Sequence, residues 1–232
     1  MTVGIMQPYF LPYIGYWQLI QAVDKFVVYD NIKFTKKGWI NRNRFLQNGK
    51  EALFSLPVKN DSDALDVVER ELAQDFDPAK LISRFREAYR KAPYFHCTMP
   101  LLESIFLFGG RNLFQFIFQS ILRTRDHLEI ATDIIVSSEI AIDHGLKGQE
   151  KVLAICGALG AKTYINSIGG AELYSSAAFS SRGIELRFLK PMAFVYPQYA
   201  NPFVAWLSIA DVLMFNSRVE AQQLLTRQFE LI

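Results

Sequence analysis

The first thirty residues alternate a short apolar strand, a helix and a second apolar strand, and no other part of the chain constrains the fold as strongly. Residues 3–6 are typical of a buried strand that stops at Gln7. Residues 13–22 carry apolar side chains at helical spacing, and residues 26–29 form a second apolar run. Two strands joined by a helix over this length form a βαβ unit, which requires a parallel sheet. We therefore predict an α/β protein with a parallel, Rossmann-like sheet.

The alternation of strands and helices is interrupted in the middle of the chain. The pair Asp77-Pro78 is a favourable helix start, and the apolar stripe that follows indicates core packing. Helices are expected over residues 78–91, 94–108 and 111–126, as a helical insertion in the α/β domain. The predicted division is an N-terminal part of the α/β domain with the site loops (1–76), a helical subdomain (77–130) and a C-terminal part of the α/β domain (131–232).

After residue 130 the alternation of strands and helices returns. The predicted strands cover residues 134–136, 162–166 and 184–188, and a further strand is expected earlier in the chain at 53–58. The predicted helices cover residues 147–159, with Gly160 as the stop signal, 207–215 and 217–228.

Composition excludes several classes of protein. The 232 residues carry 25 Lys and Arg against 23 Asp and Glu, a balance that argues against binding nucleic acid through phosphate neutralisation. The longest apolar runs are too short for a membrane span, and the first residues lack the pattern of a secretory signal peptide. The two cysteines, Cys97 and Cys156, lie far apart, and Cys156 sits in an apolar run typical of a protein core. We expect a cytoplasmic protein without membrane insertion.

The turn after the first predicted strand and the loop after the second are rich in special residues. The turn combines prolines and a glycine with aromatic and amide side chains, and the loop is basic and rich in amides. Ligands bind at the carboxyl ends of strands in open α/β sheets. The candidates in these segments are Gln7, Tyr9, Tyr13, Tyr16, Lys36 and Arg42 for ligand binding, and Asp30, Asn41 and Asn43 for catalysis. Alternatively, the aromatics only pack the sheet, Asp30 caps a loop, and the basic residues form a solvated surface.

Three later segments add candidates. Gly169-Gly170 follows a predicted strand, where glycine lets backbone N–H groups approach an anion, although an ordinary turn explains the pair equally well. Asp211 lies in an apolar run and must be exposed, paired or functional; we predict a partner, either backbone N–H groups or an Arg or Tyr of the N-terminal loops. The ligand-binding candidates here are Gly169, Gly170, Tyr196 and Asp211, and Gln198 is a candidate catalytic residue.

A parallel sheet brings strand ends to one edge, so these scattered residues are expected to line a single cleft. The three histidines, His96, His127 and His144, share neither a helix turn nor the spacing of metal ligands. No metal is therefore expected, and the identity of any cofactor stays open.

At these segments the chain resembles the WbqC-like family of bacterial proteins over nearly its whole length. The matching segments are residues 7–16, 27–31, 39–44, 159–161, 164–170, 183–184, 196–198 and 207–216. The resemblance implies a place in surface-polysaccharide synthesis, such as that of O-antigen. It also implies transfer of an aminoacyl group, glycyl in particular, to the amine of a nucleotide-linked sugar.

The turn after the first strand is also remotely similar to the start of nucleotidyltransferases with the HxGH signature. In those enzymes the two histidines stabilise a triphosphate. Tyr13 and Tyr16 stand at the corresponding places here, after about three extra residues. A tyrosine donates a hydrogen bond but carries no positive charge near neutral pH, which argues against adenylyl transfer by the usual route.

These observations predict a transferase that binds a nucleotide-activated sugar or another small anionic ligand. Acyl transfer to an amine needs a base, donors for the developing oxyanion, and contacts for the diphosphate. The expected roles are Asp30 as base or amine anchor, Asn41, Asn43 and Gln198 as donors, and Arg42, Lys36 and the Gly169-Gly170 backbone as phosphate contacts. The alternative is a nucleotidyltransferase-like enzyme or a non-catalytic nucleotide-sugar binding protein. The acyl donor, the sugar and the oligomeric state stay open.

Overall fold

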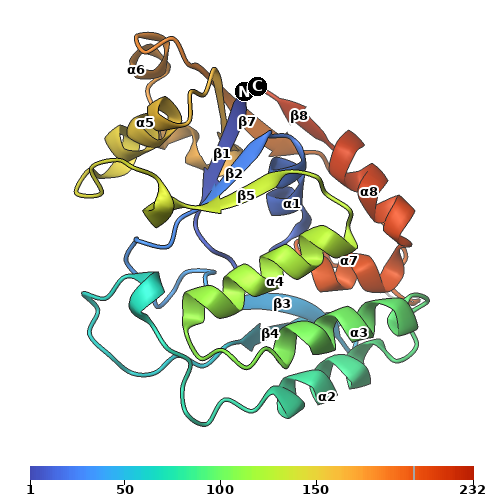
Figure 1. The fold of residues 1–232 in the computed structure, drawn as a ribbon. Coiled ribbons are helices and arrows are strands. Elements are labelled where there is room, and N and C mark those ends of the chain that lie inside the picture. Colours follow the sequence, from blue (N-terminus) through green and yellow to red (C-terminus); the bar gives the residue numbers. More distant parts are fainter. Residues whose placement is uncertain (201) are drawn as a thin grey trace.

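The computed structural model describes residues 1–200 and 202–232 and has a six-stranded central sheet (Figure 1). The strands lie in the order β5-β2-β1-β6-β7-β8, and all neighbouring pairs except β7-β8 are parallel. Their bounds are β1 (Thr2–Met6), β2 (Lys25–Val28), β5 (Asp133–Val136), β6 (Thr163–Ser167), β7 (Glu185–Pro191) and β8 (Phe229–Leu231). The predicted α/β class with a Rossmann-like sheet is confirmed. The antiparallel edge strand β8 was not predicted.

The chain reverses its direction of winding at β1. It runs outward from β1 to β2 and β5 on one side, then returns to place β6 and β7 on the other side. Gly4 of β1 pairs with Phe26 of β2 and with Ile165 of β6, so the two halves of the sheet meet at this strand. Such a reversal opens a crevice beyond the carboxyl ends of the central strands.

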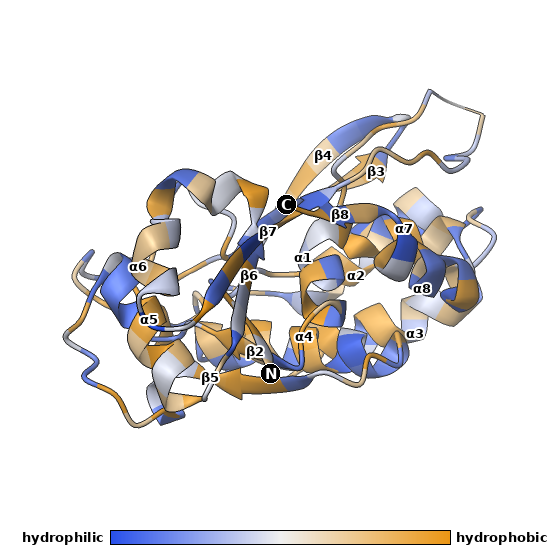
Figure 2. Cartoon of the chain, turned by 90° about the horizontal axis from the view of Figure 1, so that it is seen from above, coloured by the Kyte–Doolittle hydropathy of each residue, from blue (hydrophilic) through white to orange (hydrophobic). Residues whose placement is uncertain are grey.

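Helices cover both faces of the sheet, which Figure 2 shows edge-on between the two helical layers. The helices on one face are α1 (Ile14–Gln21), α4 (Leu113–His127) and α8 (Arg218–Arg227), and those on the other are α5 (Gly148–Ala158) and α6 (Ser176–Ser180). Alternating strand residues supply both layers, with Phe26 in the larger apolar cluster and Val27 in the smaller. Cys156 is fully buried in the smaller cluster, where burial raises the pKa of its thiol to about 12. This agrees with its expected place in the core.

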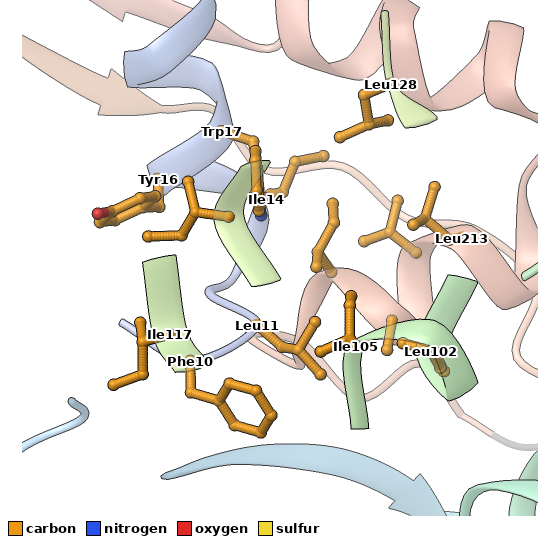
Figure 3. Packing of buried hydrophobic residues seen from close by; sticks show 14 of the residues in the cluster. Phe10, Leu11, Ile14, Tyr16, Trp17, Leu102, Ile105, Ile117, Leu128 and Leu213 are labelled. Atoms are coloured by element: carbon orange, nitrogen blue, oxygen red, sulfur yellow. The ribbon is translucent and has the colours of Figure 1, made fainter. Parts of the chain in front are cut away.

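The helical middle of the chain contains α2 (Pro78–Tyr89), α3 (Phe95–Phe106) and α4, close to the predicted positions. Asp77 caps α2 by accepting a hydrogen bond from the Ala79 N–H at 2.9 Å. In Figure 3, Phe10 and Leu11 of the β1–α1 turn lie among Leu102 and Ile105 of α3 and Ile117 of α4. The aromatic turn is thus anchored in the larger apolar cluster, which joins the helical middle to the sheet.

The expected basic loop begins a strand instead. The strands β3 (Arg42–Gln47) and β4 (Lys50–Ser55) form a separate antiparallel hairpin, with Phe45 and Phe54 against Phe85 of α2 at ring distances of 4.9 and 5.1 Å. Asn48 and Gly49 both have positive φ, 52° and 74°, as a two-residue hairpin turn requires. The Asn-Gly pair was a readable hairpin signal. The prediction that the basic loop includes Arg42 and Asn43 was wrong, whereas Asn41 does lie in a turn before β3.

The remaining helical segments are α7 (Ile209–Phe215) and the short helices η1 (Val67–Glu69), η2 (Ser137–Glu139) and η3 (Ile168–Leu173). Leu11 takes the strained left-handed conformation with φ 45°, and Asn43 of β3 donates to its carbonyl at 2.5 Å. In the part of the chain that the structure describes, no helix is long and apolar enough to cross a bilayer.

Candidate functional site

A cavity of about 990 Å³ lies beyond the carboxyl ends of β1, β2 and β6, where the sheet reverses its winding. The turn from β1 into α1 forms one wall, the loop after β2 another, and the start of α5 a third. Its volume matches the upper range of small-molecule sites. The fold therefore places a ligand-sized space where open α/β sheets bind ligands.

Tyrosines form much of the wall. They are Tyr9, Tyr13, Tyr16, Tyr29 and Tyr174. Burial raises the pKa of each of them, so the hydroxyls stay neutral hydrogen-bond donors at neutral pH. The Tyr16 hydroxyl donates to the Gln7 carbonyl at 3.0 Å, which ties the start of α1 to the end of β1.

Gly15 lets the Tyr13 ring approach the first turn of α1 closely. A Cβ on Gly15 would approach the Tyr13 ring to 2.5 Å, closer than a real contact allows. Glycine at position 15 therefore serves close approach and not a special backbone angle, since a Cβ there would push the Tyr13 ring aside. The position of the Tyr13 ring in the cavity wall thus depends on the absence of a side chain at position 15.

A polar network fills the corner between β2 and α5. Lys151 of α5 donates to the side-chain oxygen of Asn31 at 2.9 Å and to its carbonyl at 3.3 Å. The Ser137 hydroxyl lies 2.9 Å from that same side-chain oxygen and donates to the Asp30 carboxylate at 2.7 Å. The Asp30 carboxylate also accepts the Ser138 N–H at 3.0 Å. Asp30 is almost fully buried and does not line the cavity, whereas Asn31, the next residue in the chain, does. The Ser137 hydroxyl lies within hydrogen-bond distance of both side chains.

This network fixes the tautomer of His144. An ammonium group only donates, so the Asn31 atom that faces Lys151 must be oxygen and the side-chain nitrogen must face the other way. That nitrogen lies 2.9 Å from Nδ1 of His144, which therefore accepts. The neutral ring then carries its proton on Nε2. His144 lines the cavity and is a hydrogen-bond donor in this arrangement.

The glycine pair after β6 also reaches the cavity. Gly169 and Gly170 line it together with Asn166 and Ser167. A Cβ on Gly170 would lie 3.1 Å from the Asn166 side-chain oxygen, which accepts the Ser167 N–H at 2.6 Å. Close approach to Asn166 thus explains the second glycine.

Six of the fourteen predicted site residues line this cavity: Gln7, Tyr9, Tyr13, Tyr16, Gly169 and Gly170. The other eight lie elsewhere: Asp30, Lys36, Asn41, Arg42, Asn43, Tyr196, Gln198 and Asp211. The expectation of one cleft lined by all of them is therefore corrected. Some of these eight residues stabilise the fold, and others lie behind the cavity wall or on the surface.

Asp211 is fully buried and lies in a second polar cluster. Its carboxylate accepts hydrogen bonds from the Tyr89 hydroxyl at 2.8 Å, the Tyr196 hydroxyl at 2.6 Å and the Gln198 amide at 2.7 Å. The predicted pairing of Asp211 is present. Its partners come from α2 and the segment before α7, however, and not from the N-terminal loops, because α7 packs against the helical middle.

The basic segment around β3 supports the cavity from outside. The guanidinium groups of Arg42 and Arg44 lie 5.4 and 5.0 Å from the ring centre of Trp39, which lines the cavity. Lys36 pairs with Asp63 at 2.8 Å on the surface. Asn41 donates to the Leu56 carbonyl at 2.8 Å, and Asn43 holds the β1–α1 turn.

Sequence reasoning missed the polar lining residues Asn31, His144, Lys151 and Asn166. Asn31 and Asn166 each lie just after or at a strand end, which was a usable signal. His144 and Lys151 carried none, since they reach Asn31 across more than a hundred residues of sequence. Among the described residues, no group of three or more His, Cys, Asp or Glu side chains is placed to hold a metal ion.

The sequence profile of the WbqC-like protein family matches residues 7–223, which begin with the cavity-lining Gln7 and extend into α8. The chain belongs to the WbqC-like protein family. A relative from Mycobacterium tuberculosis (strain ATCC 25618 / H37Rv), "Uncharacterized protein Rv1507c", is 26% identical over 222 residues, which cover 94% of this chain and 95% of that protein. No solved structure matches the chain. The matched region contains the cavity-lining residues from Gln7 to Tyr174.

Proposed function

We propose that this WbqC-like protein is a transferase of surface-polysaccharide biosynthesis. It moves an aminoacyl group, glycyl in particular, to the amine of a nucleotide-linked amino sugar. The observation that carries the proposal is the cavity itself, a ligand-sized space at the switch point of the sheet with neutral tyrosine walls and a polar corner. Tyrosine faces suit a base or sugar ring, and amide and hydroxyl groups suit its polar edges. The setting proposed for this reaction is the cytoplasm.

The reaction needs a neutral amine, an acceptor for its proton and donors for the developing oxyanion. The neutral sugar amine attacks the carbonyl carbon of an activated acyl donor, and the new C–N bond forms. The bond to the donor's leaving group breaks, the leaving group keeps the electron pair, and the proton lost by the amine passes to it. Negative charge develops on the carbonyl oxygen during the attack, and fixed donors stabilise it. In this proposal the Nε2–H of His144 supplies one such donor, because the Asn31 amide occupies Nδ1.

Asp30 serves in this proposal as a positioning residue and not as a base that touches the amine. Its carboxylate accepts from Ser137, and Ser137 also contacts Asn31, which orients both His144 and Lys151. Arg42 acts through Trp39 and Asn43 through the β1–α1 turn. Asn41 instead fixes the chain before β3 by donating to the Leu56 carbonyl. The cavity-lining residues Gln7, Tyr9, Tyr13 and Tyr16 remain proposed ligand contacts.

A nucleotide-sugar binder or a nucleotidyltransferase-like enzyme is the second candidate. The feature that favours it is the position of Tyr13, Gly15 and Tyr16, which stand at the cavity where the HxGH-type enzymes carry their signature. The tyrosines supply hydrogen bonds and faces but no positive charge. Of these two possibilities, the uncharged tyrosines favour a protein that binds a nucleotide sugar without transferring an adenylyl group.

The test is turnover. The protein is incubated with nucleotide-linked amino sugars and activated glycine donors, and the products are followed by mass spectrometry. The proposal predicts the mass increase of one glycyl group and loss of the free amine. A rise in melting temperature with nucleotide sugars, without any product across the donor panel, supports the binding alternative and overturns the transferase.

A further inference from the structure

Lys151 is a buried cation without an anionic partner among the described residues. It is 6% exposed and lines the cavity. Its ammonium donates only to the two oxygens of Asn31, which are neutral, and it lies 5.5 Å from the centre of the Tyr29 ring. Burial lowers the pKa of Lys151, and the more distant carboxylates of Asp30 and Asp66 offset only part of that fall. A buried charge that neutral groups alone satisfy is costly unless a ligand completes the pair.

The start of α5 adds positive potential beside Lys151. Residues 144–148 all line the cavity, and α5 begins at Gly148 without a side-chain cap on its first N–H groups. Helix N-termini attract anions through these groups and the helix dipole. Glu150, the acidic residue of the first turn, pairs with Arg182 at 2.9 Å. The negative charge of Glu150 is therefore paired with Arg182 and opposes an anion at the helix start less than a free carboxylate does.

Charge elsewhere around the cavity is already balanced. Lys33 pairs with Asp66 at 2.8 Å, and both line the cavity. Lys36 and Arg42, the cations expected to hold phosphate, are engaged on the surface with Asp63 and with Trp39 and a backbone carbonyl. Lys147 and Lys151 make no ion pair within the described chain and flank the start of α5.

We infer that Lys151, Lys147 and the first N–H groups of α5 form a diphosphate subsite, an inference that rests on the proposed function. The phosphates of the nucleotide-linked sugar lie against the start of α5, and Lys151 completes its charge pair with a phosphate oxygen. The nucleoside and sugar then extend along the tyrosine walls. Asn31 both orients Lys151 and fixes His144, so the subsite and the reacting end of the cavity share one hydrogen-bond network.

Calorimetric titration of the full chain with inorganic pyrophosphate tests the subsite. Lys151→Met is expected to weaken binding about tenfold or more, as loss of a charge-assisted contact predicts. Lys147→Glu, at an exposed position where folding is not at risk, is expected to weaken it about tenfold. The matched control is Lys80→Ala on the exposed face of α2, where pyrophosphate affinity is expected to equal that of the wild type. Circular dichroism checks that each variant is folded.

Two results overturn the subsite: a wild-type protein that does not bind pyrophosphate, or Lys147→Glu and a folded Lys151→Met that bind it within about twofold of the wild type. The proposed function fails separately. If the Lys151 and Lys147 variants lose pyrophosphate binding and the wild type glycylates no amino sugar, the subsite stands and the transferase does not. If both variants glycylate a nucleotide-linked sugar with unchanged KM, the transferase stands and the subsite is wrong.

Discussion

At the scale of single residues, the structure has two separate buried polar clusters, one around Asp30 and one around Asp211. The sequence predicted instead that Asp30 and Asp211 line a single cleft. Asp30, Ser137 and Asn31 form a network that opens on the cavity through His144 and Lys151. Asp211 and its three hydrogen-bond donors lie outside the cavity lining, and they link α7 to α2 and to the segment before α7. The same residue type, a carboxylate among apolar neighbours, thus positions a site in one case and joins helices in the other.

Replacing Asp211 by Ala should lower the free energy of unfolding by about 2–5 kcal/mol, because two tyrosine hydroxyls and an amide lose their acceptor in a buried setting. Urea unfolding measures the change. Tyr196→Phe, which removes one donor and leaves the acceptor with two, should cost about 1 kcal/mol. Equal losses for the two variants would contradict the account of the cluster.

The same carboxylate gives the stability a pH dependence. Burial raises the pKa of Asp211 above 3.8, and the hydrogen bonds from Tyr196, Tyr89 and Gln198 offset only part of that rise. An acid with a raised pKa in the folded state binds its proton more tightly there, so stability falls as pH rises from its ordinary pKa through the raised one. The wild type should therefore lose stability relative to Asp211→Asn across the acidic range above pH 3.8. Paired urea titrations measure this, and a pH-independent difference would refute the direction.

At the scale of elements, the start of α1 and the start of α5 carry the site, and each depends on glycine for a different reason. Gly15 allows contact with Tyr13, whereas Gly148 begins α5 with φ 53°, a conformation that side chains rarely adopt. Helix α1 is short and almost wholly buried, so its position is set by packing and not by its own propensity.

Gly15→Ala should displace the Tyr13 ring and weaken nucleotide-sugar binding, while alanine's better helix propensity limits the stability change to within about 1 kcal/mol. Thermal melts with and without nucleotide sugar measure both. The matched control is Gly157→Ala in α5, where a Cβ meets no atom within 4 Å. This control should gain about 0.5–1 kcal/mol and bind as the wild type does. Unchanged binding in Gly15→Ala would remove Tyr13 from the ligand site.

At the scale of the whole molecule, the larger apolar cluster joins all three predicted parts of the chain. Phe10 of the β1–α1 turn contacts Phe106 and Phe116 of the helical middle at ring distances of 6.3 and 5.9 Å, and Leu213 of α7 belongs to the same cluster. The hairpin β3-β4 joins it through Phe45 and Phe54. The helical middle therefore buries its apolar face against both ends of the chain.

We expect urea unfolding to give one coincident transition when followed by far-ultraviolet and near-ultraviolet circular dichroism, because this shared cluster links the sheet to the helical middle. Phe116→Ala in the middle of the cluster should lower the urea midpoint of both signals together. The free energy of unfolding should fall by about 3–5 kcal/mol. Separate transitions, with only one shifted by the variant, would show that the helical middle unfolds on its own.

The sequence by itself determined the class of fold and the edge of the sheet that holds the cavity. Apolar runs of strand length, a helix between them and Gln7-Pro8 as a stop are local signals, and local signals fix the βαβ unit. Because parallel strands end on one side, the turn from Gln7 to Tyr13 and the pair Gly169-Gly170 were expected at that edge, and residues of both line the cavity. The Asn48-Gly49 turn was equally readable, although Arg42 and Asn43 of β3 had been assigned to a loop.

Only the tertiary structure decided which polar residues face the cavity. Asp30 meets Ser137 across 107 residues of sequence, Asn31 meets Lys151 across 120, and Asp211 meets Tyr89 across 122. Such pairs depend on how helices and strands pack, and no local pattern of polarity records the partner. A carboxylate in an apolar stretch predicts that a partner exists, because a buried unpaired carboxylate is too costly. Which residue is that partner depends on tertiary packing.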